Sequence, residues 1–243
     1  MDSPQSIYPR TISFIVLALN EVEKISNTVK TLCNSIISSN LDNYEIILVD
    51  DGSSDGTGEL MDEIGKGKPN IKVIHNPKNL GFGAAYLRGV EDASMEYVMI
   101  IAGDNTMPES SIQTVVNSIG KSDMVLPFMT DARYRPFVRF FGSWAFARLI
   151  NILFKNRIKY YNSMVVRRAL FSSIKVDATG YTLQAECVNK FLALGATYFE
   201  IGVEHGHRLN RNSTSHALKI KNLKNVFSSL FALYGNFKKT NAL

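Results

Sequence analysis

One short segment, residues 46–49 (Ile-Ile-Leu-Val), constrains the fold of this chain more than any other. It is wholly apolar and mostly β-branched, which is typical of a strand buried on both faces of a parallel sheet. The segment stops at Asp50-Asp51-Gly52-Ser53, where acidic, glycine and hydroxyl residues favour a turn. From Thr57 onward the pattern predicts a helix.

The same alternation of an apolar run and a helical pattern recurs along the first half of the chain. Strands are predicted over residues 11–19, 71–75 and 97–102, and helices over about 20–39, from Thr57, and over about 79–93. Asn20 with Glu23 predicts a capping box at the start of the first helix. Strands alternating with helices imply βαβ units, so we expect an α/β fold with a mostly parallel sheet in a single domain.

Two acidic loops are expected at one edge of this sheet. In open α/β sheets ligands bind at the carboxyl ends of the strands, so Asp50 and Asp51 are candidates for binding ribose hydroxyls or base N–H groups. The alternative is an acidic turn that caps a helix. Gly103 and Asp104 follow the strand over residues 97–102, where oxygen ligands could share Mg²⁺ or Mn²⁺ with a diphosphate. A plain helix-start turn competes with that interpretation.

The glycine-containing loop at residues 79–83 could bring backbone N–H groups close to a phosphate. Its Gly-x-Gly lacks the third glycine and the later acidic residue of a dinucleotide fingerprint, and it follows the third predicted strand rather than the first. A nicotinamide or flavin enzyme is therefore disfavoured, and no P-loop is present in the sequence.

Composition narrows the class further. The chain has 243 residues with a net charge of +5, and acidic residues gather before Arg133 while the remainder is basic, which favours a phosphate-bearing or anionic partner. The basic residues are not arranged in a nucleic-acid recognition motif. Cys33 and Cys187 predict free thiols rather than a disulfide or zinc site. We expect neither a signal peptide nor a transmembrane helix.

Two basic, apolar segments could form interfacial helices. In residues 137–157 one helical face is expected to hold Val138, Phe141, Ala145, Leu149, Ile152 and Leu153. Arg139, Ser143, Arg148, Asn151 and Lys155 would lie opposite, and residues 218–239 repeat the pattern. Such helices can lie in a membrane interface, but core packing is the commoner explanation and is slightly favoured. Arg133, Arg135 and Arg139 suit a phosphate nucleophile, or form a solvated face.

Taken together, several segments resemble family 2 glycosyltransferases of the GT-A fold, and among them the dolichol- or polyprenol-phosphate sugar synthases. The matching segments are Leu19-Asn20-Glu21, Val49-Asp50-Asp51-Gly52-Ser53-Ser54-Asp55-Gly56-Thr57, Asn79-x-Gly81-x-Gly83-x-Ala85-x-x-x-Gly89, and Asp104 with Pro108. Looser matches are Asp131-Ala132-Arg133-Tyr134, Gln184-x-Glu186 and Arg208-x-x-x-x-Ser213.

The resemblance implies roles for particular residues. Glu21, Asp50 and Asp51 would hold the nucleoside of a nucleotide-sugar, Asp104 would carry Mg²⁺ or Mn²⁺, and Arg133 and Arg208 would face phosphates. The rest of the implied donor site is Ala18, Asn20, Ser53, Gly81, Gly83, Arg88, Gly103 and Ser213. Asp104, Arg133 and Glu186 are the expected catalytic residues, with Glu186 the only candidate base. The nucleotide-sugar half would cover about residues 8–128 and the acceptor half about residues 129–243.

The sequence departs from that family at several positions. Ala102 stands where the first Asp of Asp-x-Asp is expected, Thr106 where those synthases often have Gln, and Leu17, Arg211 and Thr214 replace other motif residues. One metal ligand fewer implies weaker metal binding unless Asn105, His205 or His207 substitutes.

These observations lead to one functional hypothesis and two alternatives. The chain is expected to be an inverting glycosyltransferase that moves a sugar from a UDP- or GDP-sugar to a polyprenyl phosphate. It would act as a cytoplasmic protein bound peripherally to the inner membrane face, with a homo-oligomer or a membrane subunit as possible partners. Alternatively, the acceptor is a sugar hydroxyl in surface-polysaccharide assembly, or the protein binds nucleotide-sugars without catalysis.

Overall fold

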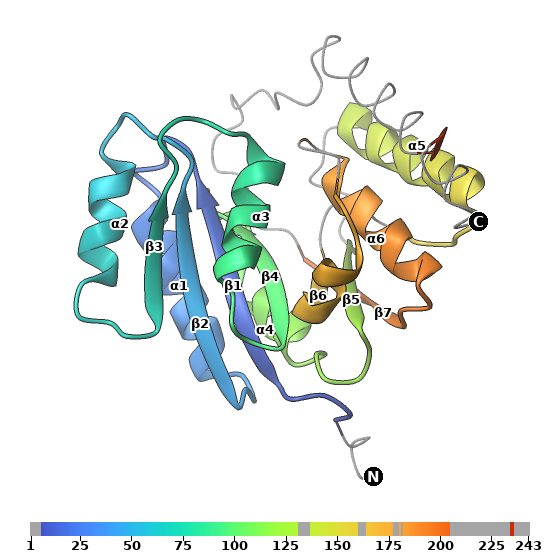
Figure 1. Cartoon of the computed structure of the whole chain (residues 1–243), viewed down its shortest axis with the longest axis horizontal. Helices are drawn as coiled ribbons and strands as arrows, with labels where there is room; N and C mark the ends of the chain where they lie inside the picture. Colours follow the sequence, from blue (N-terminus) through green and yellow to red (C-terminus); the bar gives the residue numbers. More distant parts are fainter. Residues whose placement is uncertain are drawn as a thin grey trace.

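A seven-stranded sheet with helices on both faces forms the body of the molecule (Figure 1). The computed structural model describes residues 6–130, 137–159, 164–176, 180, 182–204 and 234–235, and only the backbone for residues 137–141. The sheet order is β3-β2-β1-β4-β6-β5-β7. Its strands are β1 (Thr11–Ala18), β2 (Asn43–Asp50), β3 (Ile71–His75), β4 (Tyr97–Ala102), β5 (Met124–Met129), β6 (Val165–Arg167) and β7 (Tyr198–Val203).

The four strands predicted from the sequence are confirmed and are parallel to one another. β1 pairs with β2 and β4, and β2 pairs with β3, all in parallel register. The three-residue β6 is antiparallel to both β4 and β5, and β7 is parallel to β5. The fold is thus the expected α/β architecture with a mostly parallel sheet, extended by strands that the sequence did not predict.

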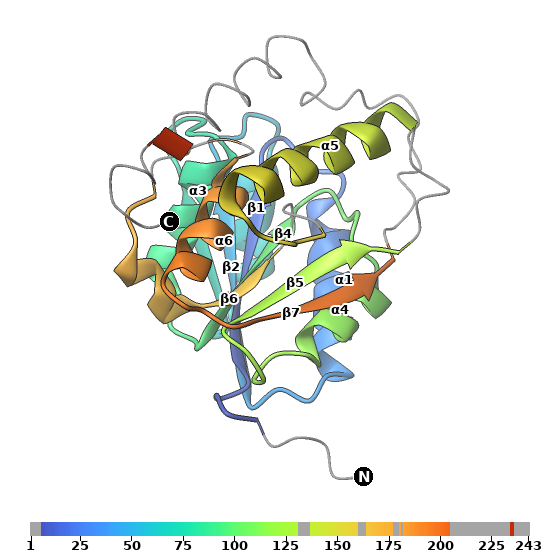
Figure 2. The ribbon, with the colours of Figure 1, turned by 90° about the vertical axis from the view of Figure 1, so that its right-hand side faces the viewer.

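The helices form one layer on each face of the sheet. They are α1 (Ile25–Ile37), α2 (Thr57–Gly65), α3 (Phe82–Asp92), α4 (Glu109–Val116), α5 (Phe137–Phe154) and α6 (Leu183–Ala193), with a 3₁₀ helix, η1 (Arg168–Ser173). Residues of α1, α2 and α4 share one apolar core, and those of α3, α5 and α6 share the other. Figure 2 shows α1 and α4 on the side of the sheet opposite α3 and α6.

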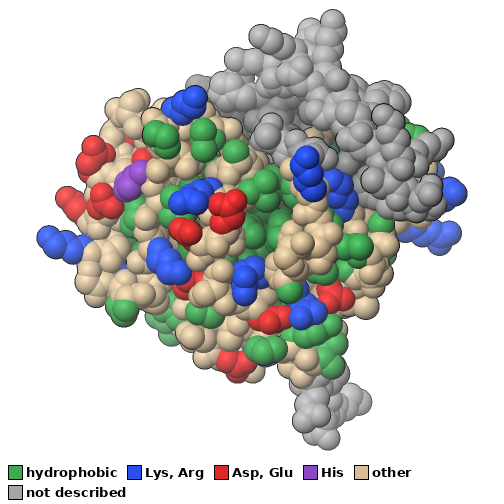
Figure 3. Space-filling model, in the orientation of Figure 1, with side chains coloured by type: hydrophobic (Ala, Val, Ile, Leu, Met, Phe, Trp, Pro, Cys, Tyr) green, Lys and Arg blue, Asp and Glu red, His purple; other side chains and the backbone are tan. Residues whose placement is uncertain are grey.

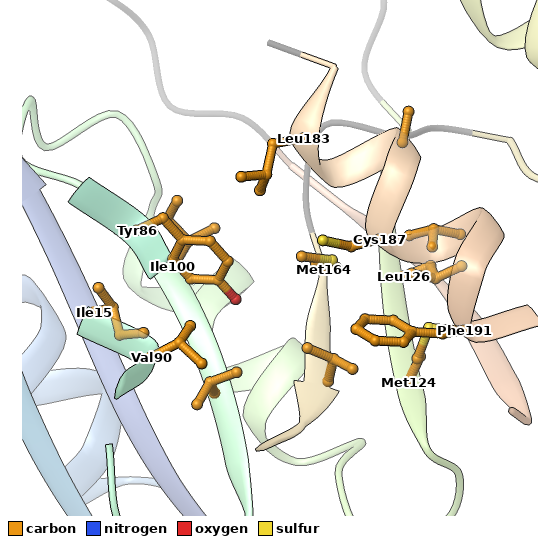
Figure 4. Packing of buried hydrophobic residues seen from close by; sticks show 14 of the residues in the cluster. Ile15, Tyr86, Val90, Ile100, Met124, Leu126, Met164, Leu183, Cys187 and Phe191 are labelled. Carbon is orange, nitrogen blue, oxygen red and sulfur yellow. The ribbon is translucent and has the colours of Figure 1, made fainter. Parts of the chain in front are cut away.

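The strands alternate their side chains between these two cores, as strand geometry requires. In β1, Ile15 and Leu17 pack beneath α3, while Phe14 and Val16 face α1. Figure 4 shows Tyr86 of α3 and Phe191 of α6 among the apolar residues that fill the first core. Helix α3 lies very close to β1, because a Cβ at Gly89 would meet Ile15 Cγ2 at 2.4 Å.

Two predicted helix starts are wrong. Helix α1 begins at Ile25 rather than near Asn20, and its N-cap, Lys24, makes no side-chain capping bond. Asn20 has a φ of 56°, a left-handed conformation in which its side chain accepts a hydrogen bond from Ser54 instead of capping a helix. Helix α3 begins at Phe82, so residues 79–81 remain a loop. Both differences lengthen loops at the carboxyl ends of the strands.

Helix α5 confirms core packing, and Leu149 and Leu153 contact the core as predicted, but the buried face is rotated relative to the predicted one. Its buried residues are Ala147, Ile150 and Phe154, whereas Ile152, which was expected on the apolar face, is 68% exposed. The correction follows from a three- and four-residue spacing that places Ile150 rather than Ile152 toward the sheet. The predicted helix over residues 218–239 lies outside the described residues, except for residues 234–235.

Two further sequence predictions concern cysteines and membrane spans. Cys33 in α1 and Cys187 in α6 are free thiols, as expected. Among the helices that the structure describes, none combines the length and apolarity needed to cross a bilayer.

Candidate functional site

Four loops meet at the carboxyl ends of the parallel strands, and we refer to them together as the strand-end site: residues 19–24, 51–56, 76–81 and 103–108. The end of β1 lies between the ends of β2 and β4, because Ala18 is in register with Asp50, and Leu17 with Ala102. Neighbouring strands are about 4.8 Å apart, so the ends of β2 and β4 are separated by about 10 Å. The structure therefore brings Asp51 and Asp104 to the same edge, on either side of β1.

Asp51 is the anchor of the glycine-containing loop. It is 6% exposed, and its Oδ1 accepts hydrogen bonds from Asn76 Nδ2 and the Leu80 amide, both at 2.9 Å. Its Oδ2 accepts one from the Gly81 amide at 3.0 Å. A carboxylate that accepts several amide hydrogen bonds is fixed in place. Asp51 thus positions residues 79–81 rather than standing open to a ligand.

Gly52 makes this contact between the two loops possible. It has a φ of 75°, and a Cβ there would lie 2.5 Å from the carbonyl carbon of Lys78 and 2.7 Å from the Asn79 amide nitrogen. Only glycine tolerates both the left-handed conformation and the approach of another backbone. The Asp-Asp-Gly sequence therefore holds residues 78–81 in place through both a carboxylate and a missing side chain.

Asp50 is also buried and internally bonded. Its Oδ1 accepts a hydrogen bond from the Ser53 amide at 2.9 Å, and its Oδ2 lies 3.2 Å from His75 Nδ1. Burial alone would raise the pKa of this carboxyl, but the hydrogen bonds from Ser53 and His75 lower it below its ordinary value. The residue is therefore an anion at neutral pH.

Asn20, Glu21 and Ser53 join the loop after β1 to the loop after β2. The Asn20 amide donates to Ser53 Oγ at 3.0 Å, and the Ser54 amide donates to Asn20 Oδ1 at 2.9 Å. The Glu21 amide donates to Thr57 Oγ1, while its carboxylate, 23% exposed, pairs with Lys24 Nζ at 2.6 Å. Of these three, Glu21 presents a carboxylate at the surface of the site.

The loop after β4 packs against β1 and leaves Asp104 half-buried. A Cβ at Gly103 would lie 2.9 Å from Ala18 Cβ, and the Gly103 amide donates to the Leu17 carbonyl at 2.8 Å. Asp104 Oδ1 accepts a hydrogen bond from Thr106 Oγ1 at 2.7 Å, which forms a turn ahead of α4. The turn predicted as an alternative is therefore present, and it fixes the carboxylate at the edge of the site.

At the end of β4, the described residues offer a metal one carboxylate, that of Asp104. Ala102 is exposed at the end of β4, and Asn105 has a φ of 53°. Within the described part of the chain, no group of three or more His, Cys, Asp or Glu side chains is arranged to hold an ion. Mg²⁺ is often bound by one or two carboxylates plus substrate phosphates. Asp104 fits the protein share of such a joint site, but not a site made by protein alone.

The other predicted site residues lie near the four loops, on α3, on α6, or outside the described residues. Ala18 is buried, and its carbonyl accepts the Asp51 amide at 2.9 Å; Gly81 has a φ of 88°, and Gly83 is buried in the first turn of α3. Arg88 is exposed on α3 and pairs with Glu91 at 3.3 Å. Glu186 lies on α6, away from the four loops in sequence, is 1% exposed and pairs with Lys190. Arg133, His205, His207, Arg208 and Ser213 lie outside the described residues.

Sequence reasoning missed two residues at the end of β3, His75 and Asn76. His75 contacts Asp50, and Asn76 contacts Asp51, so each acidic residue of the pair has its own partner. The signal was available, because the third predicted strand ends at His75, beside the strand that ends at Asp50. Parallel neighbours end at the same edge, which brings polar residues at their ends together.

Comparison with known proteins gives partial sequence relatives and extensive structural matches. The chain is 32% identical over 108 residues to the glycosyltransferase GlyG of Streptococcus pneumoniae, covering 43% of this chain and 36% of that protein. It is 32% identical over 106 residues to a dolichyl-phosphate beta-glucosyltransferase of Trichomonas vaginalis, covering 42% and 31%. The matched region is thus about a third of the length of these curated relatives.

Solved structures resemble the whole described fold. The UDP complex of glucosyl-3-phosphoglycerate synthase from Mycobacterium tuberculosis superposes with a TM-score of 0.69, at 21% identity, over 93% of this chain and 80% of the other. The same synthase has also been crystallised with Mn²⁺, UDP and phosphoglyceric acid. At this identity the likeness shows a shared GT-A fold and nothing about the substrate.

The family itself follows from a match over most of the chain. The model of glycosyl transferase family 2 matches residues 13–175, a region that contains most of β1, all of β2 to β4 and all four loops of the strand-end site. The chain therefore belongs to glycosyl transferase family 2.

Proposed function

We propose that this protein transfers a sugar from a UDP- or GDP-sugar to a polyprenyl phosphate, with inversion at the anomeric carbon. The observation that supports this most is the position of the acidic residues: the buried Asp50 and Asp51 lie on one side of β1, and the half-buried Asp104 lies on the other. The two sides are separated by about 10 Å, a span suited to a nucleoside on one side and a diphosphate on the other.

The nucleoside would bind on the β2 side. Asp50 and Asp51 fix the loops there, and the Glu21 carboxylate, 23% exposed, is available to ribose hydroxyls or base N–H groups. Asp104 would hold Mg²⁺ or Mn²⁺ together with the donor diphosphate. When bound, that ion would neutralise the charge that develops on the leaving group.

The acceptor half supports a phosphate nucleophile better than a hydroxyl. A hydroxyl needs a general base near its proton, whereas a lipid phosphate is already anionic and needs cationic positioning. Glu186, the one candidate base, is 1% exposed and pairs with Lys190 on the same helix, which suits a structural role. The arginines proposed to position the phosphate are Arg133 and Arg208.

An exposed stripe on α5 supports action at a membrane surface. Trp144 is 52% exposed and Ile152 is 68% exposed, and the exposed Arg148 lies between them at helical spacing. Lys155 follows at the end of the helix, and α5 contains no acidic residue. Tryptophan and basic side chains suit the headgroup region of an anionic bilayer. We propose peripheral attachment to the cytoplasmic face through this stripe.

The proposal can be tested by measuring nucleotide release from a panel of UDP- and GDP-sugars. Each donor is tested with and without Mn²⁺, and with either a short polyprenyl phosphate or a sugar with a free hydroxyl as acceptor. Release that requires the polyprenyl phosphate supports the proposal. Release only with hydroxyl acceptors would favour the alternative function in polysaccharide assembly. Donor binding without release would indicate an inactive nucleotide-sugar-binding protein.

A further inference from the structure

His75 occupies an unusual position at the edge of the strand-end site. It is the last residue of β3 and is in register with Asp50, the last residue of β2. Its Nδ1 lies 3.2 Å from Asp50 Oδ2, and its Nε2 lies 3.2 Å from Asp62 Oδ1 on α2. The imidazole thus connects a buried carboxylate of the site to an exposed carboxylate on a helix surface.

Two residues of helix α2, Gly58 and Asp62, allow His75 to contact both carboxylates. A Cβ at Gly58 would lie 2.8 Å from Asp50 Oδ2 and 3.2 Å from His75 Nδ1, so a larger residue would press on the pair. Asp62 lies four residues further along α2, on the same face of the helix. One helix therefore supplies both the space for the Asp50–His75 contact and the carboxylate that holds the other ring nitrogen. Figure 3 shows a histidine among acidic side chains on the α2 side of the molecule.

The two contacts of the His75 ring depend on its protonation state. A neutral imidazole has one N–H donor and one acceptor nitrogen, whereas ionised carboxylates only accept. Both contacts are hydrogen bonds at once only when the ring is protonated. The hydrogen bond with Asp50, followed by the contact with Asp62, raises the pKa of His75 above its ordinary value, against the opposing effect of burial. Within the described part of the chain, the charged groups that contact the ring are Asp50 of β2 and Asp62 of α2.

We propose that His75 is a positioning residue that holds the Asp50 carboxylate, and through it the loop over residues 50–53, in the arrangement that binds the donor nucleoside. The role rests on the proposed function, since it concerns the same donor. Asp50 Oδ1 accepts the Ser53 amide, so movement of this carboxylate also moves the turn that carries Ser53, whose Oγ accepts a hydrogen bond from the Asn20 amide of the neighbouring loop. A neutral ring satisfies only one of its two carboxylates, and donor binding weakens as pH rises.

The test measures the affinity of the full-length chain for UDP-glucose and GDP-mannose by calorimetry, from about pH 5.5 to about pH 8.5. These diphosphate diesters have no group that titrates in this range, so the donor contributes no pH dependence. Loss of one hydrogen bond on a charged group predicts a Kd that is at least about tenfold weaker at high pH. His75→Gln should bind weakly throughout, without that pH dependence.

Two surface variants separate the bridge from a general charge effect. Asp62→Asn removes the outer partner of His75 and should shift the midpoint of the affinity profile to lower pH. Glu63→Gln makes the same change of charge at the next residue, which is exposed, and should leave the profile unchanged. The proposal is overturned if His75→Gln keeps the wild-type pH dependence, or if the wild-type affinity does not vary with pH.

A measurement without nucleotide distinguishes this proposal from the proposed function. Histidine NMR titrations, assigned by comparison with His75→Gln, should give His75 a pKa above about 6.5 that falls in Asp62→Asn and not in Glu63→Gln. Equal titration of His75 in the wild type, in Asp62→Asn and in Glu63→Gln would refute the bridge alone. Absence of binding to either nucleotide-sugar at any pH, with a normal bridge, would refute the donor site and with it the role of His75.

Discussion

Asp51→Ala should destabilise the folded chain more than Asp51→Asn, because the two changes break different numbers of hydrogen bonds. Alanine removes the acceptors for Asn76 Nδ2, the Leu80 amide and the Gly81 amide. The Gly81 amide keeps a second acceptor in Asn79 Oδ1, at 2.8 Å. Two donors are then left without a partner, and Asn76 is only 6% exposed.

The cost can be estimated from these two donors. A buried donor left unsatisfied costs about 1–3 kcal/mol, so the alanine variant should lose about 2–6 kcal/mol. The lower half of that range is expected, because the half-buried Leu80 amide can reach water after a small movement of the loop. Asparagine keeps an oxygen for Asn76 and Leu80 and sets an amide group against the Gly81 amide. It should therefore cost about 1–2 kcal/mol.

Urea unfolding followed by circular dichroism measures both values. Glu63→Gln serves as the control, because this exposed acidic residue should change the free energy of unfolding by less than about 0.5 kcal/mol. Equal losses for the alanine and asparagine variants, or a loss below about 0.5 kcal/mol for alanine, would refute the anchoring role. Donor binding should fall in the same order, since residues 79–81 are held by this carboxylate.

Three other predictions concern stability, membrane binding and metal. Burial would raise the pKa of Glu45, but hydrogen bonds from Ser94, Lys72 and Ser13 lower it to about 2. Its carboxylate should therefore contribute about 3 kcal/mol to the free energy of unfolding above about pH 4.5, and this contribution should be lost as pH falls toward about 2. The free energies of unfolding of wild type and Glu45→Gln, measured with urea across this range, should converge in acid. Parallel curves would contradict this. The fluorescence of Trp144, the only tryptophan of the chain, should shift to the blue with anionic vesicles and not with zwitterionic ones, and an Arg148→Gln variant should need more anionic lipid; no shift would rule out the α5 stripe. Asp104→Ala should abolish metal-dependent binding of a UDP-sugar, and unchanged dependence on Mn²⁺ would show that the ligand lies elsewhere.

The sequence predicted the elements whose apolar pattern is complete within a short window. β1 to β4 are nearly continuous apolar runs that end in polar turns. β1, β3 and β4 were predicted to within one residue, and β2 extends the apolar run over residues 46–49 to Asn43–Asp50. The capping box failed because Asn20 is used by a contact with Ser54, a residue 34 positions away. A local pattern cannot reveal that a distant loop competes for the same side chain.

The second half of the sheet depends on pairings that a local pattern does not show. β6 has three residues, and β5 carries Pro127 and pairs with β7, more than seventy positions later. Asp50, Asp51 and Asp104 were placed at one edge correctly because parallel strands share their carboxyl ends. His75 and Asn76 were missed because their partners are set by which strand lies beside β2.

The narrowness of β6 has a consequence for how the two halves of the molecule are joined. Three residue pairs connect it to β4 and two connect it to β5, so few main-chain bonds cross this seam. Side chains such as Met164, Val165 and Val166, all fully buried, must carry most of the cohesion. Van der Waals contacts lack the directionality of a hydrogen-bonded ladder. We therefore expect that exchanging these side chains for larger or smaller ones would alter the angle between the halves, and with it the approach of an acceptor to the donor, without breaking the sheet.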